Sequence, residues 1–175
     1  PLWLQFGFGL SPFSSGIGAF ASAVGSMGMK SLAARIIRTF GFLNIMVINS
    51  IVSSVFLAAS ALFTVTTPLL LIMIILLIGG FFRSLQFTAI NTLAYAEVEP
   101  AQMSRATTLV SVNQQLAISA GVAVGAFSVE STMLVRHVQE LSAADFAPGF
   151  IVVAIISTIS AYFFYEMPAD AGHQV

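Results

Sequence analysis

The sequence predicts an all-α integral membrane protein with five transmembrane helices plus the end of a sixth. Hydrophobic residues make up 58% of the 175 residues, charged residues only 7%, and the mean hydropathy is +0.98. A soluble domain carries roughly 25% charged residues, so this chain has too few polar side chains to cover a water-facing surface. Residues 39–82 contain no ionisable side chain, whereas one span needs only about 20 residues. The run LLLIMIILLIGGFF (69–82) lacks the alternation of a membrane β-strand.

The first complete helix is expected at about 15–34. PLWLQF (1–6) is interpreted as the tail of a preceding span, and GFGLSPF (7–13) breaks the chain after it. Ser14 or Ser15 is a suitable N-cap. Lys30, Arg35 and Arg38 mark the point where this helix leaves the bilayer.

Turn residues and charges delimit the other four helices, which are expected at about 44–63, 69–96, 106–127 and 148–165. TVTTP (64–68) closes the second helix, EVEPAQMSR (97–105) follows the third, and Pro148 suits the first turn of the last.

The segment 129–141 places apolar and charged residues at helical spacing. It is expected to be either a short amphipathic helix on the outer surface or an extension of the fourth helix. His137 within it has no His or Cys neighbour, which favours a solvated surface histidine over a metal ligand.

The distribution of Lys and Arg predicts the orientation, because these residues are retained on the cytoplasmic side. The connections at 30–44 and 97–105 carry most of them and are expected in the cytoplasm, together with the C-terminus. The opposite connections hold only Arg136.

Rows of small residues at four-residue spacing predict where helices pack closely, since small side chains let backbones approach in a membrane. Such rows are Gly18, Ser22 and Ser26 on the first helix, and Ala117, Gly121 and Gly125 on the fourth.

The third helix carries the most informative polar pattern. Arg83 is the only charged residue between Arg38 and Glu97, and a charge at mid-span usually faces a cavity. Plotted as a helix, small and polar residues lie on both sides of it, namely Gly79, Gly80, Ser84, Gln86, Thr88, Asn91 and Tyr95. We expect Arg83, Gln86 and Asn91 to line a substrate path. The alternative is a structural arginine bonded to backbone carbonyls or glutamine side chains.

The fourth helix contributes three adjacent amides, Asn113, Gln114 and Gln115, which point in three directions. Gln115 shares a face with Ser111. One amide is expected to bridge helices and another to reach the path, so Ser111, Gln114 and Gln115 join the substrate-path candidates.

Several functions find no support in the residues. All seven acids lie at expected helix ends or in connections, whereas proton-coupled transport needs an intramembrane carboxylate or His. There is no cysteine, no metal-ligand cluster, no nucleophile–base pair and no basic nucleic-acid patch. We expect neither an enzyme nor a cofactor-binding protein.

Motifs in sequence order resemble the major facilitator superfamily, and most closely its fourteen-helix drug–proton antiporter branch of the EmrB/QacA type. In EPAQMSRATTLVSVNQQLAISAGVAVG (99–125), the residues that fit the branch are Pro100, Gln102, Arg105, Ala106, Asn113, Gln115 and Gly121. GSMGMKSLAARIIRTFGF (25–42) resembles its cytoplasmic motif at Arg35, Arg38 and Gly41, without the usual acid. LQFGFGLSPFSSG (4–16) and MPADAG (167–172) resemble an outer loop and the cytoplasmic tail. GSMGMK and NTL (91–93) point to one bacterial multidrug subgroup.

This resemblance implies the last five helices of a fourteen-helix transporter, hence part of its C-terminal bundle. The implied mechanism is export of small molecules by alternating access, driven by the proton gradient, in the bacterial inner membrane. The coupling acids would then lie in the N-terminal remainder of the same transporter. The expected partners are this remainder, the lipid bilayer and the small-molecule substrate. Lys30, Arg35, Arg38, Gly41 and Arg105 become cytoplasmic gate-loop candidates.

Two alternatives remain at this stage. The chain could be a stand-alone five-helix scaffold subunit, or it could belong to an importer of the same fold, because fold does not determine transport direction.

Overall fold

The computed structural model describes residues 3–64, 66–136 and 142–168, and this part of the chain is helical without a strand. It contains five long helices: α1 (Pro12–Phe40), α2 (Phe42–Ala61), α3 (Leu69–Tyr95), α4 (Met103–Arg136) and α5 (Ala143–Tyr165). Two short elements accompany them: the π-helical turn η1 (Trp3–Gly7) and the 3₁₀ turn η2 (Pro100–Gln102).

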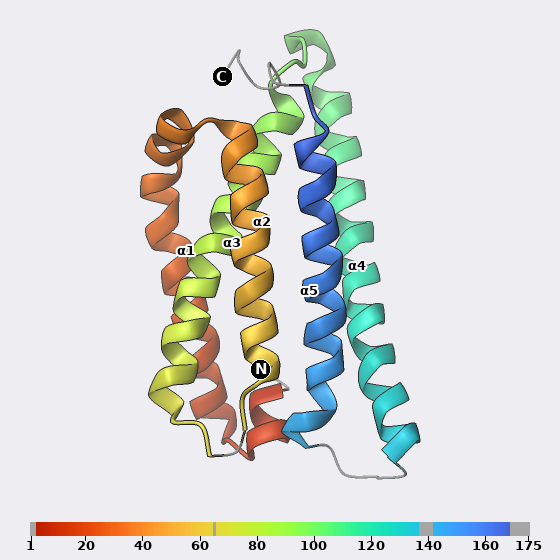
Figure 1. Ribbon diagram of the computed structural model, residues 1–175. Helices are drawn as coiled ribbons and strands as arrows, with labels where there is room; N and C mark the ends of the chain where they lie inside the picture. Colours follow the sequence, from red (N-terminus) through yellow and green to blue (C-terminus); the bar gives the residue numbers. More distant parts are fainter. Residues whose placement is uncertain (1–2, 65, 137–141, 169–175) are drawn as a thin grey trace.

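Successive helices run in opposite directions along one common axis (Figure 1). We name the two ends of the bundle by one residue each. The Gly41 end holds the α1–α2 connection and η2, and the Trp3 end holds η1, the α2–α3 connection and the start of α5. Helices α1 and α3 form one edge, α2 lies in the middle, and α5 and α4 form the other edge.

Four of the helices are long and apolar enough to cross a membrane: α2, α3, α4 together with η2, and α5. The first expected span, α1, has 29 residues and is therefore long enough, but it is not among the four because it is rich in Ser and Gly and ends in three cations. The all-α membrane fold class is confirmed, with four of the five long helices apolar enough to span.

Helix α1 begins and ends outside its expected bounds. Its N-cap is Ser11, whose Oγ accepts a hydrogen bond from the backbone N–H of Ser14 at 3.2 Å, and Pro12 occupies the first helical position. The expectation of Ser14 or Ser15 was therefore too late by one turn, because Pro12 begins the helix and does not break it. The helix continues to Gly41, where a φ of +79° ends it.

Helices α4 and α5 also exceed their expected bounds. Of the two alternatives for 129–141, the described part is an extension of α4 through Arg136, while 137–141, including His137, lies outside the described residues. Helix α5 begins five residues earlier than expected because Ser142 and Asp145 form a capping box. Pro148 consequently lies inside the helix, where neighbouring helices can compensate for its missing N–H. The expected cytoplasmic tail beyond residue 168 is likewise outside the described residues.

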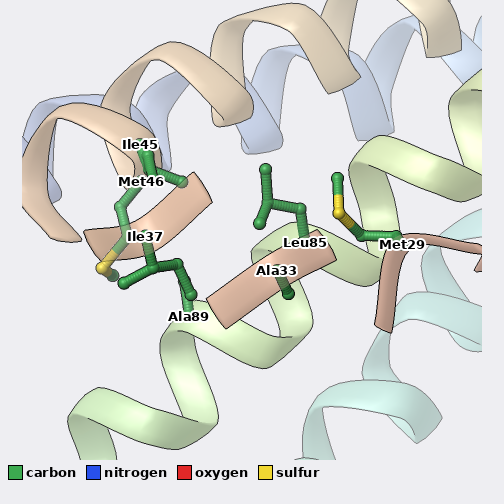
Figure 2. Packing of buried hydrophobic residues seen from close by; sticks show 7 residues of the cluster. All are labelled: Met29, Ala33, Ile37, Ile45, Met46, Leu85 and Ala89. Carbon is green, nitrogen blue, oxygen red and sulfur yellow. The ribbon is translucent and has the colours of Figure 1, made fainter. Parts of the chain in front are cut away.

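Two apolar clusters hold the bundle. Near the Gly41 end, α1, α2 and α3 share a core of Met29, Ala33, Ile37, Ile45, Met46, Leu85 and Ala89 (Figure 2). Near the Trp3 end, Leu4, Phe63 and Ile72 form the second cluster, and the Trp3 ring lies 4.9 Å from the Phe150 ring of α5. These contacts order η1 against α5 and leave the polar side of α3 to face α1, α2 and α4.

Candidate functional site

Helices α1 and α3 approach so closely that their seam requires glycine. A Cβ built on Gly25 would lie 2.1 Å from the carbonyl oxygen of Leu77, and one built on Gly80 would lie 2.3 Å from the carbonyl oxygen of Ser22. Both distances are far below van der Waals contact. A Cβ built on Gly18, also on α1, would lie 2.8 Å from Cδ1 of Leu4, the end of a flexible side chain that can shift, and 3.8 Å from Cδ1 of Leu76 on α3.

Serine hydroxyls bond across the same seam. Ser26 Oγ donates to the carbonyl oxygen of Gly80 at 3.1 Å, and Ser84 Oγ donates to that of Ser26 at 3.0 Å. The row Gly18–Ser22–Ser26 therefore lies at the α1–α3 seam, with small side chains that permit the approach and hydroxyls that bond to the facing backbone.

Arg83 lies at the centre of α3 and its side chain is exposed. Its Nη2 donates to Ser22 Oγ at 3.4 Å, close to the limit of a hydrogen bond. The one ion pair among the described residues is elsewhere, between Arg136 and Asp145. A charge at the bilayer centre costs at least about 2.5–3.5 kcal/mol, which a single long bond to a neutral hydroxyl does not offset. Arg83 thus needs water or further polar groups around it.

Gln86 joins α3 to α2. Asn49 Nδ2 donates to Gln86 Oε1 and to the carbonyl oxygen of Phe82, each at 2.8 Å, and Gln86 Nε2 donates to Ser50 Oγ at 3.0 Å. Asn49 is only 3% exposed and Ser50 only 2%. Gln86, predicted to line the path, is therefore engaged in a buried bridge between helices.

Sequence reasoning missed Asn49 and Ser50, although an amide next to a hydroxyl in the middle of a membrane span was a usable signal. The Asn49 carboxamide is not fully satisfied. Its Oδ1 and the Oγ of Ser53 are buried without a hydrogen-bond partner in the described chain. Two such groups, four residues apart on α2, suit an internal water molecule.

Asn91 and Gln114 connect α3 to α4. Gln114 Nε2 donates to Asn91 Oδ1 at 2.8 Å, and Asn91 Nδ2 donates to the carbonyl oxygen of Phe87 at 2.7 Å. Of the three adjacent amides on α4, Gln114 is thus the one that bridges helices. Gln115 and Ser111 are exposed and take no part in this bond.

The small-residue row of α4 differs from expectation. Ala117 and Gly121 are exposed, and a Cβ built on Gly121 or Gly125 would meet no atom within 4 Å. Helix α4 has no buried residue at all. Of this row, Gly125 approaches α5, where a Cβ built on Gly149 would lie 3.9 Å from the Gly125 carbonyl oxygen, while Ala117 and Gly121 are exposed.

The gate-loop candidates lie at the Gly41 end, mostly in helices. The prediction of a loop at 30–44 is wrong, because Gly41 alone links α1 to α2. Lys30, Arg35 and Arg38 are exposed on the last turns of α1. No Gly or Pro occurs from 29 to 40 to end the helix, and Met29, Ala33 and Ile37 bury its opposite face. Arg105 is exposed in the first turn of α4.

A buried ion pair at the Trp3 end also escaped sequence reasoning. Arg136 Nη1 lies 2.5 Å from Asp145 Oδ1, and Asp145 Oδ2 accepts bonds from the backbone N–H and the hydroxyl of Ser142 at 2.8 and 2.7 Å. The Asp145 side chain is 0% exposed and that of Arg136 is 45% exposed. The pair ties the end of α4 to the start of α5. The Ser-x-x-Asp spacing was the available signal.

Comparison with known proteins shows similarity along the entire chain. It is 29% identical over 172 residues to a multidrug resistance protein MdtD of Serratia proteamaculans, a match that covers 97% of this chain and 36% of the relative. The MdtD proteins of Yersinia enterocolitica and of an Enterobacter species are 30% and 27% identical and cover 98% and 100% of this chain. No family model and no solved structure matches.

The chain spans about 36–38% of the length of these curated relatives. Their name agrees with the bacterial multidrug subgroup that GSMGMK and NTL indicated. The chain is thus a multi-pass membrane protein that is similar over its whole length to the MdtD proteins, which is the relation that its motifs predicted.

Proposed function

We propose that this chain is part of a small-molecule exporter of the multidrug type, working by proton-coupled alternating access and contributing to its C-terminal bundle. The observation that carries the proposal is the similarity of the whole chain to proteins named for multidrug resistance, which are more than twice as long. The remaining spans, and the acids that couple transport to protons, belong to the N-terminal remainder of the transporter. No cofactor and no catalytic step is needed, because the proton gradient supplies the driving force.

The polar residues divide into two roles under this proposal. Gln86, Asn91 and Gln114 hold α3 to its neighbours, as their hydrogen bonds of 2.8–3.0 Å indicate. Arg83, Ser111 and Gln115 are exposed. We assign these three to the wall of the substrate path.

The orientation is part of the proposal. Lys30, Arg35, Arg38 and Arg105 all lie at the Gly41 end, so the positive-inside tendency assigns that end to the cytoplasm of a bacterial inner membrane. Alternating access then requires this end to open and close. Gly41 is its shortest connection, and the cations contact lipid head groups or the facing bundle.

The experiment begins with the coding frame upstream of Pro1. Further spans in that frame are expected, and a frame without them would favour the scaffold alternative.

The full-length transporter is then reconstituted in vesicles, where an imposed pH gradient is expected to drive substrate efflux and a protonophore is expected to abolish it. Arg83→Ala and Gln115→Ala are expected to lower efflux without lowering the amount of folded protein. If both variants transport like the wild type, the path assignment is wrong. Flux driven toward the cytoplasm would instead support an importer.

A further inference from the structure

Arg83 presents an unneutralised positive charge midway along a membrane span. It lies 14 residues after Leu69 and 12 residues before Tyr95, the two ends of α3. At a rise of 1.5 Å per residue, each end of the helix is roughly 18–21 Å away. An arginine side chain is much shorter than this, so its guanidinium cannot reach a membrane surface by extending along the helix.

The guanidinium is also largely unbonded. It carries five N–H donors, and its hydrogen-bond partner in the described chain is Ser22 Oγ at 3.4 Å. Among the described acids, the nearest in sequence is Glu97, a residue just beyond the end of α3, and the buried Asp145 is paired with Arg136 at the Trp3 end. The described chain therefore offers Arg83 no anion.

The surroundings of Arg83 suit an amphiphilic ligand. Phe87 lies one turn further along the same face of α3 and is 58% exposed. Ser22 contributes a hydroxyl that bonds only weakly to the guanidinium, so a stronger acceptor can displace it. A guanidinium beside an exposed aromatic ring suits a ligand with a carboxylate on an apolar body. Guanidinium and carboxylate pair through two parallel hydrogen bonds, and the ring can contact the apolar body.

We propose that Arg83 binds the carboxylate of a substrate with an aromatic or otherwise apolar body, so that the transported class includes organic anions. This inference rests on the exporter function proposed above and names a substrate class for the same path. The carboxylate that pairs with Arg83 has two conceivable sources, a bound substrate or an Asp or Glu of the transporter's remaining helices. The substrate is the source we propose, and the experiment distinguishes the two.

The test uses purified full-length transporter and two fluorescent probes, the aromatic carboxylate carboxyfluorescein and the aromatic cation ethidium. We expect Arg83→Ala to weaken carboxyfluorescein binding about tenfold or more. Arg83→Lys keeps the positive charge but cannot form two parallel hydrogen bonds to a carboxylate, so it should weaken binding about two- to fivefold. Ethidium binding should change less than about twofold in both variants. Asn113→Ala, at an exposed polar position on α4 that points away from the face of Ser111 and Gln115, is the matched control and should leave both affinities unchanged.

A second measurement needs no variant and so does not depend on how a substitution folds. Phenylglyoxal modifies accessible arginines, and mass spectrometry quantifies its adduct at Arg83 in the wild-type transporter. Carboxyfluorescein is expected to protect Arg83 and ethidium is not, while the exposed Arg105 should react equally under all conditions.

The outcomes separate the two sources and the two proposals. Slow modification of Arg83 without any ligand, together with a lower melting temperature of Arg83→Ala, would indicate a protein carboxylate and overturn the substrate assignment. Unchanged carboxyfluorescein affinity in Arg83→Ala, or no binding of this probe to the wild type, would overturn it as well. Proton-driven efflux of ethidium would then leave the exporter function standing. Conversely, Arg83-dependent binding without gradient-driven efflux of either probe would support the anion site and contradict the exporter function.

Discussion

Gln114 on α4 and Asn91 on α3 are joined by a hydrogen bond of 2.8 Å, in which Nε2 of Gln114 donates to Oδ1 of Asn91. Within the part of the chain that the structure describes, it is the side-chain hydrogen bond that links these two helices. The second bond of Asn91, to the carbonyl oxygen of Phe87, holds its carboxamide in the required orientation.

This bond predicts an energetic coupling between the two positions. In a double-mutant cycle with Asn91→Ala and Gln114→Ala in the full-length transporter, we expect a coupling energy of about 0.6–1.7 kcal/mol, the range typical of hydrogen bonds between membrane helices. The free energy of unfolding in mixed micelles is the measurement. A parallel cycle with Gln115→Ala, whose side chain is exposed and takes no part in the bond to Asn91, should give a coupling near zero. Equal values in the two cycles would contradict the assigned bond.

The α1–α3 seam predicts that added methyl groups will be harmful at two glycines. Gly25→Ala and Gly80→Ala force a Cβ against backbone oxygens at 2.1 and 2.3 Å, and overpacking of this kind costs about 1–3 kcal/mol. Gly28→Ala is the matched control on α1, because a Cβ there meets nothing within 4 Å. Thermal unfolding of the purified variants provides the comparison. Because Ala favours a helix over Gly by about 1 kcal/mol, Gly28→Ala should not lower the melting temperature. A fall as large for Gly28→Ala as for Gly25→Ala would contradict close approach as the cause.

The buried amide bridge predicts that Asn49 matters more than its inconspicuous place in the sequence suggests. Asn49→Ala removes two donated hydrogen bonds and leaves Gln86 Oε1 without its donor, and a buried unsatisfied polar group costs about 1–3 kcal/mol. Asn44→Ala, at an exposed position bonded only to the carbonyl oxygen of Phe40 on α1, should stay within about 0.5 kcal/mol of the wild type. The free energy of unfolding of both variants is measured by chemical denaturation. A loss of stability no larger for Asn49→Ala than for Asn44→Ala would disprove the bridge.

The ion pair at the Trp3 end predicts an asymmetric response to its removal. Arg136→Ala leaves the fully buried Asp145 carboxylate without its cation, and breaking a buried pair costs about 3–5 kcal/mol. We expect a smaller loss, about 1–3 kcal/mol, because Arg136 is 45% exposed and Ser142 still donates two bonds to the carboxylate. Arg136→Lys should restore most of the stability. Arg105→Ala, an exposed cation at the other end of α4, is the control and should be nearly neutral.

The helices were predictable where apolar length and turn residues agree. Leu69 was expected and observed as the first residue of α3, because Pro68 directly precedes it and a long apolar run follows. Boundaries set by capping were less predictable. Pro12 was interpreted as a break but begins α1, and Pro148 was interpreted as a first turn but lies inside α5, since the side chains of Ser11 and of Ser142 with Asp145 determine where those helices begin.

The candidate site was only partly predictable. Helical geometry placed Arg83, Gln86 and Asn91 on one broad polar side of α3, yet the three residues have different surroundings in the structure. Arg83 is exposed, Gln86 bonds to α2 and Asn91 bonds to α4. Periodicity within one helix gives the direction of a side chain but not the identity of the residue that meets it.

The sequence by itself determined the membrane class, the five helical segments and the relation to a transporter family, because apolar length, turn residues and motif order are local properties of the chain. Only the tertiary structure decided which polar groups meet. Asn49 is buried against Gln86, Asp145 is paired with Arg136, and Arg83 keeps most of its donors free. The physical reason is that each of these relationships joins residues on different helices, so it depends on how the helices pack and cannot be found in any one segment alone.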